Sequence, residues 1–323
     1  MEAEIIQRTG ISFSSIPAAG LHGVGIRALP GNLMKMVHGI FTSGKILRNF
    51  RPDVLFFTGG YLAVPMAIAG LAVPKILFVP DIEPGLALKF LSLFSNRITV
   101  PVEEAKRFYP TQRKLTVTGY PLRRELSEWQ RSESLKFFNL SSNLPILLVS
   151  GGSKGAHAIN RAVFDHLPSL LEQIQIIHLS GKLDWNLVEK VVATLPANLA
   201  ARYRPFPFLN EMGAAFAAAN LVLSRAGASI LGEYPYFGLP AVLVPYPHAW
   251  RYQRINAEYL AAHSAAIILP EDQLKEKLLL LITELIQTTG RLNQMSASMR
   301  SLSTSDAADR IAAQIMELAE SWS

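Results

Sequence analysis

The chain has 323 residues, half of them hydrophobic, a formal net charge of +6 and no cysteine. This length is sufficient for two domains with separate cores. The absence of thiols excludes disulfides and thiolate–metal sites and fits a reducing compartment. A pI near 9.5 favours an anionic partner such as a nucleotide, a lipid phosphate or a membrane surface. Nucleic acid is not expected, because the sequence has no long Lys/Arg run and no interleaved aromatic and basic residues.

The first residues are not typical of a secretory signal, since Glu2 and Glu4 follow Met1 in place of a basic and then apolar stretch. The most apolar window, residues 61–73, is too short to cross a bilayer. We therefore expect a cytoplasmic protein.

Residues 33–50 form the first clear element, in which Lys35, Lys45 and Arg48 are interspersed among apolar side chains. This pattern predicts a basic amphipathic helix. We expect the helix to cover a sheet from outside, and contact with a membrane surface is the second interpretation.

Short apolar runs closed by turn residues then alternate with stretches of helical period. That alternation predicts an α/β protein with parallel strands and crossover helices. The predicted strands are residues 54–58, 76–79, 98–101, 115–118, 146–150, 174–179, 221–224 and 241–245.

The alternating pattern weakens between Tyr120 and Leu144, where a polar stretch lies between Pro121 and Pro145. We place the domain boundary there. The predicted organisation is an N-terminal domain over residues 1–122, a linker over 123–144, a ligand-binding domain over 145–300 and a C-terminal segment over 301–323. Helical spacing in residues 307–322 predicts a final helix that packs back on the N-terminal domain.

The sharpest local motif runs from Val149 to Ala156, where a strand enters a glycine-rich turn and a helix begins near His157. Glycines let the backbone approach a ligand closely, and a helix N-terminus offers free N–H groups to a diphosphate. The motif is neither a Walker A loop nor a dinucleotide fingerprint. Simple turn geometry is the competing interpretation.

A second turn of small residues, 225–229, follows the strand at 221–224 and opens a helix with Glu233 in its first turn. Phosphate on the N–H groups and ribose on the carboxylate would suit a nucleotide sugar. The alternative for Glu233 is an N-terminal charge favoured by the helix dipole.

A third segment, 245–257, leaves a strand through prolines and enters a helix on which Gln253 and Asn256 share a face. Loops at the carboxyl ends of parallel strands are where ligands bind. The sequence has no Asp-x-Asp pair and no cluster at metal-ligand spacing, so we expect no metal cofactor.

These segments, together with residues 208–212 and 118–123, resemble glycosyltransferase family 28 over nearly the whole chain. The resemblance implies the GT-B fold, with two Rossmann-like domains facing a cleft. It implies an inverting transfer of N-acetylglucosamine from UDP-GlcNAc to a lipid-linked peptidoglycan precursor, converting lipid I to lipid II. It also implies a peripheral enzyme on the inner face of the plasma membrane, with no obligatory metal.

Carried over by position, the resemblance assigns a donor site to residues from four segments. Leu209 would offer backbone groups to uracil, Glu233 would hold the ribose, and Gln253 would face the sugar with Asn256 beside it. The implied donor-binding set is Gly151, Gly152, Ser153, Gly155, Leu209, Ala228, Ser229, Glu233, Gln253, Asn256 and Arg123. Tyr252 stands where the family usually has a second glutamine.

The N-terminal half departs further from the family pattern. Members open with a strand and a glycine-rich loop that bears a histidine. From the resemblance we expect that about 40 residues, enough for a βα unit and its following strand, are absent from this sequence. The family's His-Glu-Gln-Asn segment is replaced at residues 78–85. The remaining acceptor-side candidates are Gly59, Gly60, Tyr61, Asp81 and Glu83, and Asp81 is the candidate general base.

Two alternatives stay open. In the first alternative, the chain is a truncated or degenerate UDP-sugar-binding protein without transferase activity. Loss of an inner strand would favour this alternative, because it exposes sheet edges and apolar area and so destabilises the N-terminal domain. The chain would otherwise be an enzyme similar to UDP-GlcNAc 2-epimerase, for which Glu233, His248, Asp81 and Glu83 are the candidate side chains.

Overall fold

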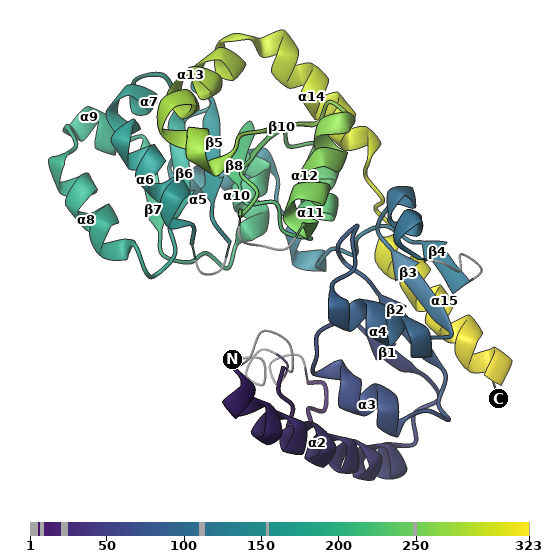
Figure 1. Cartoon of the computed structure of the whole chain (residues 1–323). Helices are drawn as coiled ribbons and strands as arrows, with labels where there is room; N and C mark the ends of the chain where they lie inside the picture. The colour runs from purple at the N-terminus through teal and green to yellow at the C-terminus, as the bar shows by residue number, and fades with distance from the viewer. Residues whose placement is uncertain are drawn as a thin grey trace. The chain divides into compact units, whose positions relative to one another are not determined.

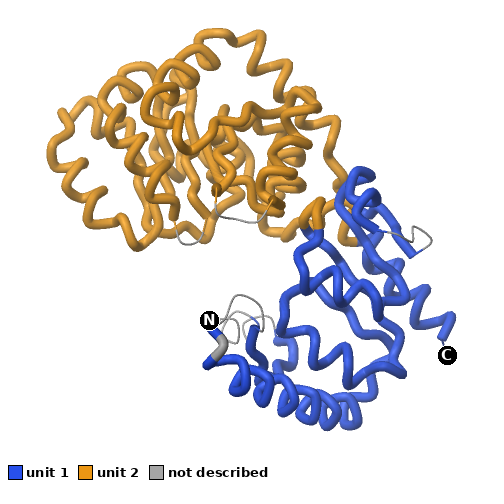
Figure 2. Tube along the Cα trace, viewed as in Figure 1, with its two compact units in different colours: residues 1–80, 84–118, 309–323 blue, residues 81–83, 119–308 orange. Residues whose placement is uncertain are grey.

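The computed structural model describes residues 6, 10–20, 25–109, 114–152, 155–247 and 251–322. The chain forms two compact units (Figure 2). Unit 1 comprises Met1–Pro80, Pro84–Thr118 and Asp309–Ser323, and unit 2 comprises Asp81–Glu83 and Gly119–Ala308.

Unit 1 contains a parallel sheet of four strands in the order β1-β2-β3-β4. Its strands are β1 (Leu55–Phe57), β2 (Lys75–Phe78), β3 (Arg97–Val100) and β4 (Leu115–Val117). Both faces of β2 are buried, which explains the apolar run that follows Lys75 in this strand. The helical elements are η1 (Ile26–Ala28), α2 (Leu29–Phe50), α3 (Ala63–Ala69), α4 (Leu86–Phe94) and η2 (Glu103–Phe108).

The last helix, α15 (Ala307–Trp322), belongs to unit 1 from Asp309 onward. It runs beside β3 and β4 (Figure 1), where Arg97 donates to the Gln314 side chain at 3.1 Å and to Glu317 at 2.8 Å. Ile311 and Leu318 are buried on its apolar face. The end of the chain therefore completes a unit that begins near its start.

Unit 2 contains a parallel sheet of six strands in the order β10-β9-β8-β5-β6-β7. The strands are β5 (Ile146–Ser150), β6 (Gln175–Leu179), β7 (Tyr203–Phe206), β8 (Leu221–Ser224), β9 (Ala241–Leu243) and β10 (Ala266–Ile268). Because β5 lies between β6 and β8, the strand order reverses at β5 and β8, as in doubly wound nucleotide-binding folds.

The crossovers of unit 2 are helical. Its core joins buried side chains of β5, β6, β8 and β9 to those of α6, α7 and α13. The helical elements are η4 (Arg124–Leu126), α5 (Arg131–Phe138), α6 (His157–Asp165), α7 (Leu167–Gln173), α8 (Trp185–Thr194), α9 (Ala197–Ala200), α10 (Met212–Ala218), α11 (Ile230–Phe237), α12 (Tyr252–Ala262), η5 (Glu271–Gln273), α13 (Leu274–Gln287) and α14 (Thr289–Ser301).

All eight predicted strands are present, so the α/β prediction is confirmed. Two strands, β7 and β10, were not predicted. The predicted linker at 123–144 is folded as η4 and α5 within unit 2, and Phe138 of α5 packs against Phe206 with ring centroids 5.7 Å apart. The units divide after Thr118. Within the described residues, no helix combines the length and the apolar character needed to cross a bilayer.

Candidate functional site

The strand reversal in unit 2 places two turns side by side. Ser150 at the end of β5 is in register with Ser224 at the end of β8. Gly151 and Arg225 therefore leave the same edge of the sheet from adjacent strands. In open α/β sheets, ligands bind in the crevice at such a reversal.

A cavity of about 490 Å³ lies at this point, and we call it the switch-point cavity. It is lined by predicted donor-site residues from the glycine loop, the second turn and α12, and by the 207–212 segment. The predicted residues that line it are Arg123, Gly151, Gly152, Leu209, Ser229, Glu233 and Gln253. Its dimensions fit a small ligand such as a nucleotide.

The glycine loop packs tightly against the neighbouring turn after β6. Gly155 has φ +79°, and a Cβ on it would lie 2.3 Å from the carbonyl oxygen of Ser180. Only glycine fits this position without strain. The helix α6 begins two residues later, so its free N–H groups follow the loop directly.

A largely buried chain of hydrogen bonds connects α6, which follows the glycine loop, to β6 and to the turn after β6. Asn160 Nδ2 donates to the Ser180 carbonyl at 2.8 Å and to Asp184 at 2.7 Å. His178 bonds to Asn160 Oδ1 at 3.0 Å and to the Tyr203 hydroxyl at 2.8 Å. Burial lowers the pKa of His178 to about 3, so the ring is neutral. His157, the first residue of α6, bonds to Asp184 at 2.8 Å.

Glu233 lies in the first turn of α11, where its carboxylate is largely desolvated. The Ser229 hydroxyl donates to Oε2 of Glu233 at 2.7 Å. Burial raises the pKa of Glu233, while the Ser229 hydrogen bond and the charge of Arg123 oppose that rise. The position suits a carboxylate that accepts hydrogen bonds from ligand hydroxyls.

Gln253, in the first turn of α12, faces the switch-point cavity with an oriented amide. Its Oε1 accepts a hydrogen bond from the backbone N–H of Tyr246 at 2.9 Å. An N–H group can bond only to the oxygen end of the amide, which fixes the direction of the Nε2 donors.

Asn256 is fully buried, and its amide contacts protein groups. Nδ2 donates to Asp81 at 2.8 Å and to the Ala226 carbonyl at 3.3 Å, and Oδ1 accepts from the Ile82 N–H at 3.2 Å. Burial raises the pKa of Asp81, although the bond from Asn256 opposes this. Glu83 pairs with Arg251 at 2.8 Å. Asp81 and Glu83 are thus held by α12 within unit 2.

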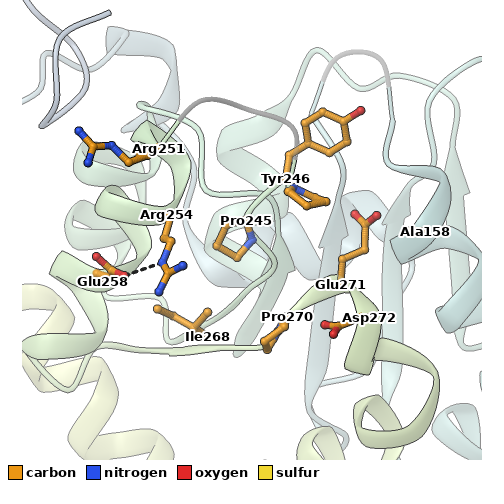
Figure 3. Close-up of a pocket in the computed structure, with 11 residues that line it drawn as sticks. Ala158, Pro245, Tyr246, Arg251, Arg254, Glu258, Ile268, Pro270, Glu271 and Asp272 are labelled. Atoms are coloured by element: carbon orange, nitrogen blue, oxygen red, sulfur yellow. Dashed lines mark hydrogen bonds and ion pairs between the residues drawn. The ribbon is translucent and has the colours of Figure 1, made fainter.

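The switch-point cavity has a larger neighbour of about 1250 Å³ in unit 2, which we call the α12 cavity (Figure 3). Arg254 and Glu258 of α12, with Arg251 just before the helix, form one wall. Tyr246 and Glu271 lie near each other on the opposite side in Figure 3.

With this geometry established, comparison with known proteins identifies the family. The model of the glycosyltransferase family 28 C-terminal domain matches residues 146–311. The model of the glycosyltransferase family 28 N-terminal domain matches residues 1–100. A Roseiflexus sp. (strain RS-1) protein is 35% identical over 97% of this chain and 80% of its own length. The chain belongs to glycosyltransferase family 28.

Two similar proteins share one descriptive name. The Roseiflexus protein and one from Bacillus subtilis (strain 168) are both UDP-N-acetylglucosamine–N-acetylmuramyl-(pentapeptide) pyrophosphoryl-undecaprenol N-acetylglucosamine transferases. The B. subtilis protein is 33% identical over 98% of this chain and 88% of its own length.

Solved structures support the fold expected of family 28. MurG from Acinetobacter baumannii has a TM-score of 0.73 at 24% identity, covering 98% of this chain and 88% of its own. A UDP-GlcNAc 2-epimerase from Neisseria meningitidis, bound to UDP-GlcNAc, has a TM-score of 0.69 at 13% identity, covering 88% and 82%. At these identities the likeness concerns the fold alone.

The remaining predicted residues of this family 28 chain lie in different places. Gly59, Gly60 and Tyr61 form the turn after β1 in unit 1, and Tyr61 is exposed. Gly155 and Ala228 are in the two turns of unit 2 described above. Ser153 and His248 lie outside the described residues.

Sequence reasoning assigned no role to several residues that line the switch-point cavity. Leu179 and Gly181 come from the end of β6, Phe208 precedes the predicted Leu209, and Arg225 begins the second turn. The available signal was position, because each of these residues lies at or just after the carboxyl end of a parallel strand.

Proposed function

We propose that this chain transfers N-acetylglucosamine from UDP-GlcNAc to a lipid-linked peptidoglycan precursor, forming lipid II from lipid I. The two relatives named above carry this activity in their names. The observation that carries the proposal here is the switch-point cavity, in which Glu233, Gln253 and the glycine loop share one lining.

The proposed reaction is an inverting displacement. An acceptor hydroxyl loses its proton to a carboxylate and attacks the anomeric carbon, and the bond from that carbon to the UDP oxygen breaks. Free N–H groups at the start of α6 and the Arg123 guanidinium are proposed to stabilise the charge that develops on UDP. No step needs a resident metal.

Asp81 is the proposed general base. Its desolvated carboxylate has a raised pKa, and a base whose pKa lies nearer the working pH accepts a proton more effectively. The Asn256 amide fixes its orientation at 2.8 Å. Asp81→Asn should lower the turnover rate by about 10²- to 10⁴-fold and leave UDP affinity intact. Unchanged turnover would remove Asp81 from this role.

The donor is tested by calorimetric titration of the purified chain with UDP, UDP-GlcNAc and UDP-glucose. We expect UDP-GlcNAc to be preferred and binding to collapse in Glu233→Ala. Glu189→Ala, which removes an exposed carboxylate on α8, is the matched control. A folded chain that binds none of the three would contradict the proposal.

Transfer itself is tested with a lipid-linked muramoyl-pentapeptide acceptor, with UDP release and the glycosylated lipid both measured. If the chain binds UDP-GlcNAc but forms no glycosylated lipid, it is a UDP-sugar-binding protein without transferase activity. Formation of UDP-ManNAc without acceptor would instead show an epimerase.

We also propose that unit 1 contacts the membrane surface. Helix α2 exposes Leu33, Met34 and Phe41, with fractional exposures of 55%, 74% and 70%, on the same helix as Lys35, Lys45 and Arg48. Apolar side chains with nearby cations suit an anionic lipid interface. Flotation with anionic vesicles should weaken when the three cations are replaced by glutamine. Undiminished flotation would exclude the electrostatic contribution.

A further inference from the structure

The Gln253 amide is oriented by a single backbone donor. Residues 245–247 read Pro-Tyr-Pro, and proline has no backbone N–H. Tyr246 therefore supplies the only backbone N–H among residues 245–247, and this N–H donates to Gln253 Oε1 at 2.9 Å. The position of the Tyr246 backbone therefore controls the orientation of the Gln253 amide.

Tyr246 is in turn held by Arg225. The Arg225 guanidinium lies over the Tyr246 ring, 5.1 Å from its centroid, and Nη1 donates to the Val244 carbonyl at 3.1 Å. These contacts tie the turn after β9 to the end of β8. A cation over an aromatic face is attracted by the ring quadrupole.

Glu271 completes the assembly from a third element. Its carboxylate pairs with Nη2 of Arg225, and the two side chains are only 27% and 12% exposed. Partial burial reduces screening of the pair by water. Glu271 lines the α12 cavity, as Tyr246 does (Figure 3), whereas Arg225 and Gln253 line the switch-point cavity.

We propose that Glu271, Arg225 and Tyr246 are positioning residues that fix the Gln253 amide and thereby set selectivity for the sugar of a nucleoside diphosphate sugar. The fixed Nε2 donors would meet a hydroxyl or acetamido oxygen of the hexose. This inference rests on the proposed function, because it assumes that the switch-point cavity holds a UDP-sugar.

Glu271→Gln is the decisive variant, since Glu271 belongs to the neighbouring cavity and would not touch the ligand. Calorimetry compares UDP with UDP-GlcNAc, which differ only by the sugar. We expect Glu271→Gln to weaken UDP-GlcNAc binding about 3- to 10-fold, the range for loss of one hydrogen bond, with UDP affinity unchanged. Tyr246→Leu should do the same.

Asp272→Asn is the matched control, because it removes a neighbouring carboxylate of η5 that lines the same cavity. We expect it to change neither affinity. Gln253→Ala should cause the same selective loss, and Glu271→Gln combined with Gln253→Ala should add nothing further, because residues that act through one group are non-additive.

Equal weakening of UDP and UDP-GlcNAc in Glu271→Gln would overturn the inference, and so would full additivity with Gln253→Ala. Thermal unfolding of each variant separates these results from loss of folding, and Tyr246→Leu provides the second route. A wild-type chain that binds UDP and UDP-GlcNAc equally would overturn the inference alone. A folded wild-type chain that binds neither would overturn the proposed function as well.

Discussion

The sheets of the two units differ in strand order. The described strands of unit 1 follow chain order from β1 to β4, so each crossover moves in the same direction. In unit 2, the chain reaches β7 and then returns to place β8 on the other side of β5. Crossovers that depart from a reversal lie on opposite faces and leave a crevice between them. The predicted donor residues gather at that crevice, whereas Gly59, Gly60 and Tyr61 of unit 1 come from one strand end.

A substitution inside the glycine loop should have the largest effect. Gly155→Ala would strain a positive φ and bring a Cβ to 2.3 Å from the Ser180 carbonyl oxygen. We expect a loss of about 2–4 kcal/mol in the unfolding free energy of unit 2, with weakened UDP binding. Chemical unfolding and calorimetry would measure these changes. Gly152→Ala should cost less, because φ is +82° there but an added Cβ would meet no described residue beyond its chain neighbours within 4 Å. Equal losses would show that the contact with Ser180 is unimportant.

A glycine in unit 1 offers the complementary test. In α2, a Cβ on Gly39 would lie 2.2 Å from the Pro17 carbonyl oxygen. Gly39→Ala should destabilise unit 1 by about 1–3 kcal/mol and leave UDP binding unchanged. Hydrogen exchange would locate the loss. Gly44→Ala, in the open part of the same helix, should stabilise it by up to about 1 kcal/mol. Reduced UDP affinity in Gly39→Ala would contradict the assignment of binding to unit 2.

Acid should destabilise unit 2 through His178. The folded pKa is about 3 and the unfolded value is near 6.5, so between these values the unfolded state binds more protons. This group then removes about 1.4 kcal/mol of unfolding free energy for each pH unit below 6.5. Unfolding titrations at several pH values should show a shallower slope in His178→Gln than in wild type.

The smallest expected effect is that of metal removal. Among the described residues, no three His, Cys, Asp or Glu side chains are grouped as a metal site. Addition of EDTA to the transfer assay should leave the rate unchanged if Arg123 and helix N-termini offset the UDP charge. A rate restored only by added Mg²⁺ would contradict this proposal.

The sequence was informative where strands are buried on both faces. β5 and β8 appear as continuous apolar runs, and their following turns were assigned correctly as the start of α6 and α11. The two missed strands, β7 and β10, are the edges of the six-stranded sheet, and β7 carries Arg204 and Pro205. An edge strand tolerates proline because one side has no partner.

Burial within a helix was harder to predict. Gln253 and Asn256 share a helical face, yet Gln253 lines the switch-point cavity and Asn256 is buried against Asp81 and Ile82. Two partners of Asn256, Asp81 and Ile82, lie more than 170 residues earlier in the chain, and spacing along one helix contains no information about them. The positioning roles proposed for Arg225 and Glu271 were equally hidden, because they join three separate elements.

The discontinuity of unit 1 bears on biosynthesis. Residues from Asp309 onward, including Gln314 and Glu317, belong to unit 1, while Gly119–Ala308 belong to unit 2. During translation, unit 2 can acquire all of its sequence before unit 1 does. Unit 1 therefore stays incomplete until α15 has left the ribosome. Until then β3 and β4 lack their contacts with α15.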